Sequence, residues 1–135
     1  MSVRNARLTS GLRLLQGAIF VVIGVNGFHP YLPQPNSVPP AALAFAGAMA
    51  QTGYFLQLLF GVQVAAGILL LADRWVPLAL TLLAPVIVNI ILFHSFLWRG
   101  GTLAAGILVL ALEIYLAWAY WESFRPLLAQ RARPR

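Results

Sequence analysis

The sequence contains no cysteine, and only three of its 135 residues are acidic. Without thiols the chain cannot by itself form disulfides, thiolate metal sites or iron–sulfur clusters, and it cannot act as a dithiol redox protein. Charged residues make up only 9% of the chain and hydrophobic residues 61%. A globular surface needs more charge than this to be solvated, so the composition excludes most classes of soluble protein.

The apolar residues are concentrated in four stretches that approach or reach the length of a membrane span. A hydrocarbon core of about 30 Å requires roughly 20 apolar residues in a helix. The stretches lack period-2 alternation, which indicates helices and excludes a membrane barrel. They cover residues 8–28, 54–71, 77–98 and 102–121. We therefore predict an all-α membrane protein, a four-transmembrane-helix bundle in which residues 1–135 form a single integral-membrane domain.

All nine basic residues are arginines, and their positions predict the orientation of the bundle. Three arginines precede or open the first stretch, Arg74 separates the second from the third, and four follow the fourth, whereas Arg99 falls on the opposite side. The positive-inside bias then predicts that both termini are cytoplasmic, with residues 122–135 as a basic tail. Because no nucleic-acid motif accompanies the arginines, we expect them to contact the lipid bilayer, and we expect no nucleic-acid partner.

The loop after the first stretch is rich in proline. Five prolines fall within residues 29–40, which favours an extended chain over a helix. Residues 41–50 are helix-prone but too short to span a bilayer, so they predict a short interfacial helix in the first outer loop. No small-x-small cleavage pattern follows the first stretch, and we expect that stretch to be retained.

Each predicted span carries one polar residue near its midpoint. A bundle can point all four inward, where they avoid the cost of an unpaired polar group in lipid. The functional interpretation is a proton relay or a polar ligand site, and the structural interpretation is a layer that fixes helix register. The structural one is favoured, since no second acid is present to pass a proton. The four residues are Gln16, Gln63, Asn89 and Glu113.

A second group of polar residues lies toward the outer ends of the first three spans. Its side chains can meet beneath the proline-rich loop and form a small-molecule pocket. Its histidines can contact a quinone carbonyl or, as a less favoured alternative, ligate a haem. The structural interpretation, without a ligand, is that His29 is solvated and His94 fills a packing gap. The candidate ligand-binding residues of this group are Asn26, His29, Tyr54, Gln57 and His94.

Catalytic motifs are missing from the chain. It has no GxGxxG loop, no P-loop, no nucleophilic triad and no zinc spacing. We therefore predict no catalytic residue, no metal ligand and no certain cofactor, and we do not expect an independent enzyme.

Three segments of the chain carry a family resemblance. Residues 52–77 read TGYFLQLLFGVQVAAGILLLADRWVP, residues 83–97 read LAPVIVNIILFHSFL, and residues 112–128 read LEIYLAWAYWESFRPLL. Together they resemble the DoxX family of small bacterial four-helix membrane proteins, over nearly the whole chain. In that family the position matching Gln63 is commonly Glu, whereas the amide here cannot ionise.

The resemblance implies a place in a membrane redox assembly. Members include a subunit of an archaeal thiosulfate:quinone oxidoreductase and a component of a mycobacterial redox complex. It therefore implies an accessory or structural subunit of a respiratory complex in the bacterial inner membrane, with a redox protein as partner and contact with quinone. The alternative is a protein that binds or transports a quinone or lipid-like molecule through the buried polar layer. Self-association into a homo-oligomer stays open, because small-residue helix faces serve it equally well.

Overall fold

The computed structural model describes residues 3–33, 35–99 and 103–128, and these residues contain helices and no strand. A π-helical turn, η1, extends the fourth α-helix, and a 3-10 turn, η2, follows the last one. The elements in chain order are α1 (Val3–Phe28), α2 (Pro40–Gln51), α3 (Phe55–Leu71), α4 (Val76–Leu92), η1 (Phe93–Leu97), α5 (Leu103–Ala119), α6 (Trp121–Phe124) and η2 (Arg125–Leu128). The all-α prediction is confirmed for the described residues.

Two helical segments are each long and apolar enough to cross a membrane. They are Asn5–Phe28, within α1, and Val76–Leu97, which joins α4 to η1. The helices α3 and α5 have 17 residues each and meet the same test only together with a bent neighbour. The pair α2 and α3 is bent by 93°, and the pair formed by α5 with the segment Trp121–Leu128 by 77°. The described residues therefore contain two such segments, or up to four if each bent pair is one span, and a bundle of four spans is not confirmed.

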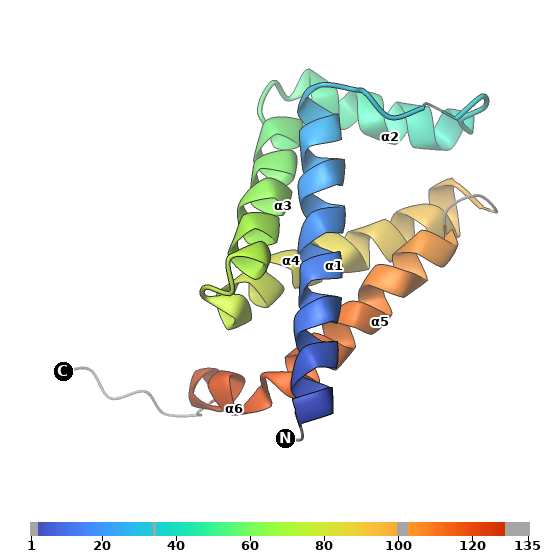
Figure 1. Ribbon diagram of the computed structural model, residues 1–135. Coiled ribbons are helices and arrows are strands. Elements are labelled where there is room, and N and C mark those ends of the chain that lie inside the picture. Colours follow the sequence, from blue (N-terminus) through green and yellow to red (C-terminus); the bar gives the residue numbers. More distant parts are fainter. Residues whose placement is uncertain (1–2, 34, 100–102, 129–135) are drawn as a thin grey trace.

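The helices are arranged as two neighbouring pairs (Figure 1). α1 and α3 stand side by side, and α4 and α5 form a hairpin that leans away from them toward the end where α2 lies. α1 also packs against α5, and α3 against α4, so each of these four helices has two neighbours among the others. The buried core lies where the pairs meet. Its fully buried large side chains include Phe20, Leu70, Leu83, Ile87 and Leu116.

The short helix predicted over residues 41–50 is present as α2, which lies across one end of the molecule (Figure 1). Pro40 stands in its first turn, where a proline's missing N–H costs no helical hydrogen bond. The sharp turn into α3 uses Gly53, whose φ of +76° favours glycine. Thr52 links the two helices, because its hydroxyl donates to the Met49 carbonyl and accepts from the Phe55 N–H.

α1 and α3 approach closely through small residues. A Cβ added to Gly17 would lie 2.9 Å from the Gly67 carbonyl oxygen, and one added to Gly67 would lie 2.8 Å from the Gly17 carbonyl oxygen. A Cβ on Gly24 would also meet the α3 backbone, 3.0 Å from the Phe60 carbonyl oxygen. The missing side chains let the two backbones touch, as small residues do between membrane helices.

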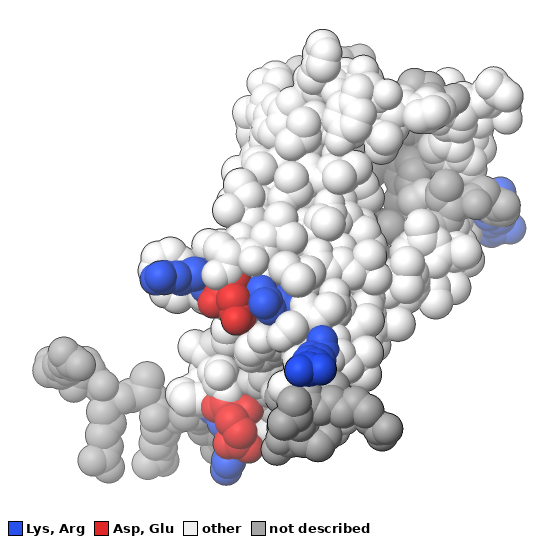
Figure 2. Space-filling model, in the orientation of Figure 1, with Lys and Arg blue, Asp and Glu red and all other residues white. Residues whose placement is uncertain are grey.

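Charged side chains gather at the end of the molecule opposite α2 (Figure 2). The start of α1, the turn between α3 and α4, and the segment after α5 all lie there (Figure 1). Arg99 follows η1 near the other end of the α4–α5 hairpin. Of the predicted basic tail, Glu122 to Leu128 belongs to α6 and η2, and residues 129–135 lie outside the described part of the chain.

Candidate functional site

A cavity of about 700 Å³ lies between the leaning hairpin, α1 and the proline-rich loop. Its walls are mostly aliphatic and carry no formally charged side chain, while Asn26 and His94 supply polar atoms. Binding sites for small molecules commonly have this size and this mixture of apolar walls with a few polar groups. The lining residues are Ile19, Phe20, Ile23, Asn26, Leu32, Pro33, Pro35, Val38, Ile90, His94, Trp98, Ala105, Gly106, Leu108 and Val109.

The loop that covers the cavity is held onto the end of α1. The Asn26 Oδ1 accepts hydrogen bonds from the backbone N–H groups of Tyr31 and Leu32, at 2.9 and 2.8 Å. The Tyr31 hydroxyl donates to the Val22 carbonyl at 2.8 Å. Proline restricts the loop further, because its φ is set by the ring. The sequence therefore builds a stiff, anchored cover, and Asn26 contributes both to this anchor and to the cavity wall.

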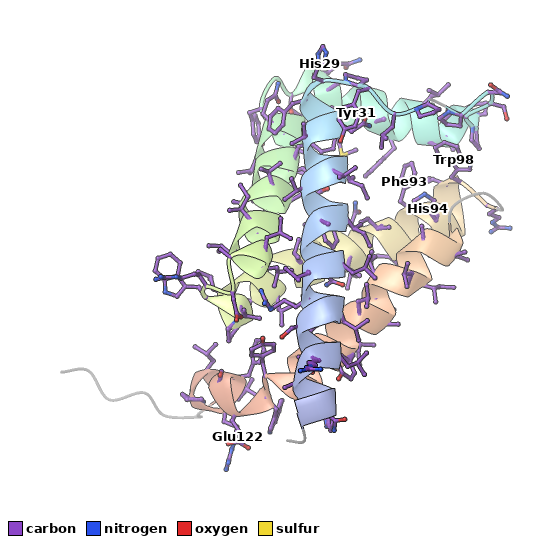
Figure 3. The ribbon with its side chains drawn as sticks, viewed as in Figure 1. His29, Tyr31, Phe93, His94, Trp98 and Glu122 are labelled. Carbon is purple, nitrogen blue, oxygen red and sulfur yellow. The ribbon has the colours of Figure 1, made fainter. Side chains whose placement is uncertain are left out.

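The opposite wall carries a group of aromatic side chains around His94 (Figure 3). The His94 ring lies against Trp98 with ring centroids 6.1 Å apart and planes at 27°, and against the edge of Phe93 at 5.1 Å. Phe93 in turn contacts Phe45 of α2, with centroids 5.9 Å apart. The His94 Nδ1 lies 2.8 Å from the Ile90 carbonyl oxygen. These contacts fix the ring in the cavity wall.

The structure brings together part of the predicted outer group. Asn26 and His94 line the same cavity, whereas His29 is exposed at the end of α1 and lies well apart from His94 (Figure 3). Tyr54 and Gln57 are also exposed and do not line the cavity. A haem held by both histidines has no support in this arrangement. Among the described residues, no group of three or more His, Asp or Glu side chains is placed to hold a metal ion.

Of the four residues in the predicted polar layer, the structure joins two by a hydrogen bond. Gln16 is fully buried and its Nε2 donates to the Glu113 Oε2 at 2.6 Å, which links α1 to α5. Gln63 is buried, but its Oε1 has no hydrogen-bond partner among the described residues. Asn89 is exposed on α4 and does not face this pair. None of the four lines the cavity.

Two buried polar contacts lie beside this pair that the sequence did not predict. Arg13, only 5% exposed, donates to the Leu70 carbonyl, and its Nε lies 3.3 Å from the Asp73 carboxylate. The Thr9 hydroxyl lies 3.0 Å from the Tyr115 hydroxyl. In the sequence, Arg13 counts only as one of the three arginines at the start of the first apolar stretch, which indicate orientation. The signal that could have found them is the helical spacing of Thr9, Arg13 and Gln16, which is typical of one polar face on a helix.

The two polar regions can do different chemistry. The cavity can hold a flat apolar molecule and offer it hydrogen bonds from Asn26 and His94. The Gln16–Glu113 pair contains one carboxyl group and an amide that cannot ionise, so it is suited to joining helices. Because the cavity combines room for a molecule with the polar groups of Asn26 and His94, it is the better candidate for a binding site.

Comparison with protein-family models, curated proteins and solved structures gives no match for this chain. The resemblance to the DoxX family therefore stays a prediction. The fold itself defines a class, an all-helical chain whose long apolar helices are typical of a membrane protein.

Proposed function

We propose that this chain binds a flat, largely apolar small molecule of the quinone class within a membrane. The observation that carries the proposal is the cavity of about 700 Å³, with apolar walls, a stacked His94–Trp98 pair and the amide of Asn26. A quinone ring fits such a wall because it has two apolar faces and an oxygen at each end. The alternative site at the buried polar layer, for binding or transport, has less support because Gln16, Gln63 and Glu113 do not line this cavity.

The membrane setting is part of the same proposal. We propose that α1, α3, α4 with η1, and α5 cross the bacterial inner membrane as four spans, with both termini cytoplasmic. The gathering of arginines at the end opposite α2 supports this orientation. In this setting α2 lies at the outer interface and the cavity opens near the outer ends of the spans.

A second proposal is that the chain is an accessory subunit of a membrane redox complex. Asn89 favours it, because this amide is exposed in the apolar segment Val76–Leu97 and has no hydrogen-bond partner among the described residues. A polar group facing lipid is costly, and a helix of another protein or of a second copy would satisfy it. The two proposals are compatible, since a subunit can also hold the quinone.

The binding proposal predicts that the cavity can be blocked by one side chain. Ala105→Trp places a bulky ring in the wall at an exposed position of α5, so the retained quinone should fall at least about tenfold. The measurement is mass spectrometry of small molecules extracted from protein purified from its host in mild detergent. Ala104→Trp is the matched control, because Ala104 is exposed on the same helix and does not line the cavity.

The outcomes separate the proposals. Equal retention in both variants, or no quinone-class or lipid-like molecule in the wild-type protein, would contradict the cavity as the binding site. Native mass spectrometry of the same preparation tests the subunit role. A stoichiometric redox partner is expected for that role, and isolation only as a monomer or homo-oligomer would count against it.

A further inference from the structure

The hydrogen bond of His94 to its own helix determines which ring nitrogen can meet a ligand. A backbone carbonyl can only accept, so the His94 Nδ1, 2.8 Å from the Ile90 oxygen, must carry the hydrogen. In the neutral ring the hydrogen is then absent from Nε2, which becomes an acceptor. No described residue is hydrogen-bonded to Nε2. The His94 edge of the cavity therefore offers an acceptor.

Asn26 offers a hydrogen-bond donor to the cavity, whereas His94 offers an acceptor. Its Oδ1 already accepts two backbone N–H groups, from Tyr31 and Leu32. This assigns the other terminal atom, Nδ2, as the amide donor that remains for a ligand. The cavity thus presents an amide donor on α1 and an imidazole acceptor on the hairpin, while the indole N–H of Trp98, which also lines the cavity, can only donate. Among these three side chains, His94 Nε2 is therefore the acceptor for a ligand.

We propose that the cavity recognises a ligand hydroxyl, with His94 Nε2 accepting the O–H of a hydroquinone while Asn26 Nδ2 donates to a ligand oxygen. This inference rests on the proposed function and specifies its ligand. A quinone carbonyl can accept from Asn26 but has no hydrogen for His94, and two facing acceptors leave both unsatisfied. A hydroquinone satisfies both side chains, because each hydroxyl both donates and accepts. The site is therefore selective for the reduced, hydroxyl-bearing form.

The test compares two ligands of nearly equal shape. Tetramethylhydroquinone and tetramethylbenzoquinone are titrated anaerobically into the full chain in lipid nanodiscs, in the same mildly alkaline buffer. Empty nanodiscs give the partitioning baseline. Since one neutral hydrogen bond differs between the ligands, the hydroquinone Kd should be about 3- to 10-fold lower. The dimethyl ether of the hydroquinone, which has no hydroxyl hydrogen and is inert to oxidation, should bind no better than the quinone.

Three variants locate the effect on one atom. His94→Asn keeps a donor for the Ile90 carbonyl but has no atom at the place of Nε2, so the preference for the hydroquinone should vanish. His94→Gln reaches that place with an amide that can accept, and hydroquinone binding should recover. His29→Asn is the matched control, because His29 is exposed and lies outside the cavity, and it should keep the wild-type preference.

The outcomes test hydroxyl recognition separately from the proposed quinone-class binding site. Equal affinities for the two ligands, or a preference that His94→Asn leaves unchanged, would overturn hydroxyl recognition while the quinone-class site stands. A preference for the quinone would overturn it as well. Failure of either ligand to bind above the nanodisc baseline, together with no effect of Ala105→Trp on retained molecules, would reject the binding function itself and the inference with it.

Discussion

Gln16 and Glu113 lie in the core, where the amide of Gln16 donates to the carboxyl group of Glu113 over 2.6 Å. Both side chains are more than nine-tenths buried. When a buried polar group loses its partner, its full desolvation cost lowers the stability of the fold. Replacing both partners by apolar groups can leave the stability nearly unchanged. The pair therefore acts on stability as a unit.

This asymmetry gives a prediction for three variants. Gln16→Leu leaves the Glu113 carboxyl without the Gln16 amide and should lower the free energy of unfolding by about 1–2 kcal/mol. The double variant Gln16→Leu/Glu113→Leu should recover most of that loss, because it removes both members of the hydrogen bond and leaves neither unpaired. Unfolding of the protein in mixed detergent micelles, followed by circular dichroism, measures both values.

Gln57→Leu is the control for this experiment, since Gln57 is an exposed glutamine on α3. It should change the free energy of unfolding by less than about 0.5 kcal/mol. If the double variant is less stable than Gln16→Leu alone, the two residues do not depend on each other as the hydrogen bond implies.

Arg13 illustrates what sequence reasoning cannot assign at a single residue. Counted with its neighbours, it is a charge at the start of an apolar stretch and indicates orientation. In the structure it lies buried against Leu70 and Asp73, and so ties α1 to the turn between α3 and α4. Asp73 and Trp75 in that turn have positive φ values of 54° and 49°. The acid that pairs with Arg13 is determined by how α3 is positioned against α1. The sequence around Arg13 does not specify that position.

At the scale of the elements, the contact between α1 and α3 depends on glycine. Gly17 and Gly67 lie so close that a methyl group on either one would meet the backbone of the other helix. A backbone atom cannot move aside as the end of a flexible side chain can. The glycines therefore set the distance between these two helices.

Gly67→Ala should lower the free energy of unfolding by about 1–3 kcal/mol, because the added Cβ would lie 2.8 Å from the Gly17 carbonyl oxygen. Gly61→Ala is the matched control on the same helix, where a Cβ meets nothing within 4 Å. It should be neutral or slightly stabilising, since alanine favours the helix. Thermal unfolding in detergent compares the two, and a Gly61→Ala loss as large as that of Gly67→Ala would contradict the proposed close contact.

For the whole molecule, the distribution of charge predicts how the chain lies in a membrane. The described arginines at the end opposite α2 belong to three separate segments, which the fold collects on one side. The positive-inside bias therefore predicts that this side faces the cytoplasm and that the loop before α2 faces outward.

The absence of cysteine makes this orientation directly measurable. Ser37→Cys and Ser123→Cys each introduce a single thiol at an exposed serine, one in the outer loop and one in α6. A membrane-impermeant maleimide should label Ser37→Cys in intact cells, and should label Ser123→Cys only after permeabilisation. Labelling of Ser123→Cys alone in intact cells would invert the predicted orientation. Labelling of both variants in intact cells would contradict the three spans, an odd number, that the proposed topology places between them.

The extent of a helix is encoded largely by local sequence, and two of the predicted stretches match helical segments of the structure closely. The predicted stretch 54–71 corresponds to α3 (Phe55–Leu71), and 77–98 corresponds to Val76–Leu97. Hydropathy, proline and glycine act on a few neighbouring residues, so these ranges follow from the composition of each window. The polar residues of each span could be named for the same reason, but their partners could not.

Partners depend on the rotation and lean of whole helices, which only the tertiary structure decides. Gln16 and Asn89 lie at similar depth in their predicted spans, yet one faces the core and the other is exposed. The cavity exists because the α4–α5 hairpin leans away from α1 beneath an anchored loop. As a result, Asn26 and His94 line the same cavity. Helix rotation and lean are settled by packing summed over many distant contacts, and no single stretch of the sequence carries that sum.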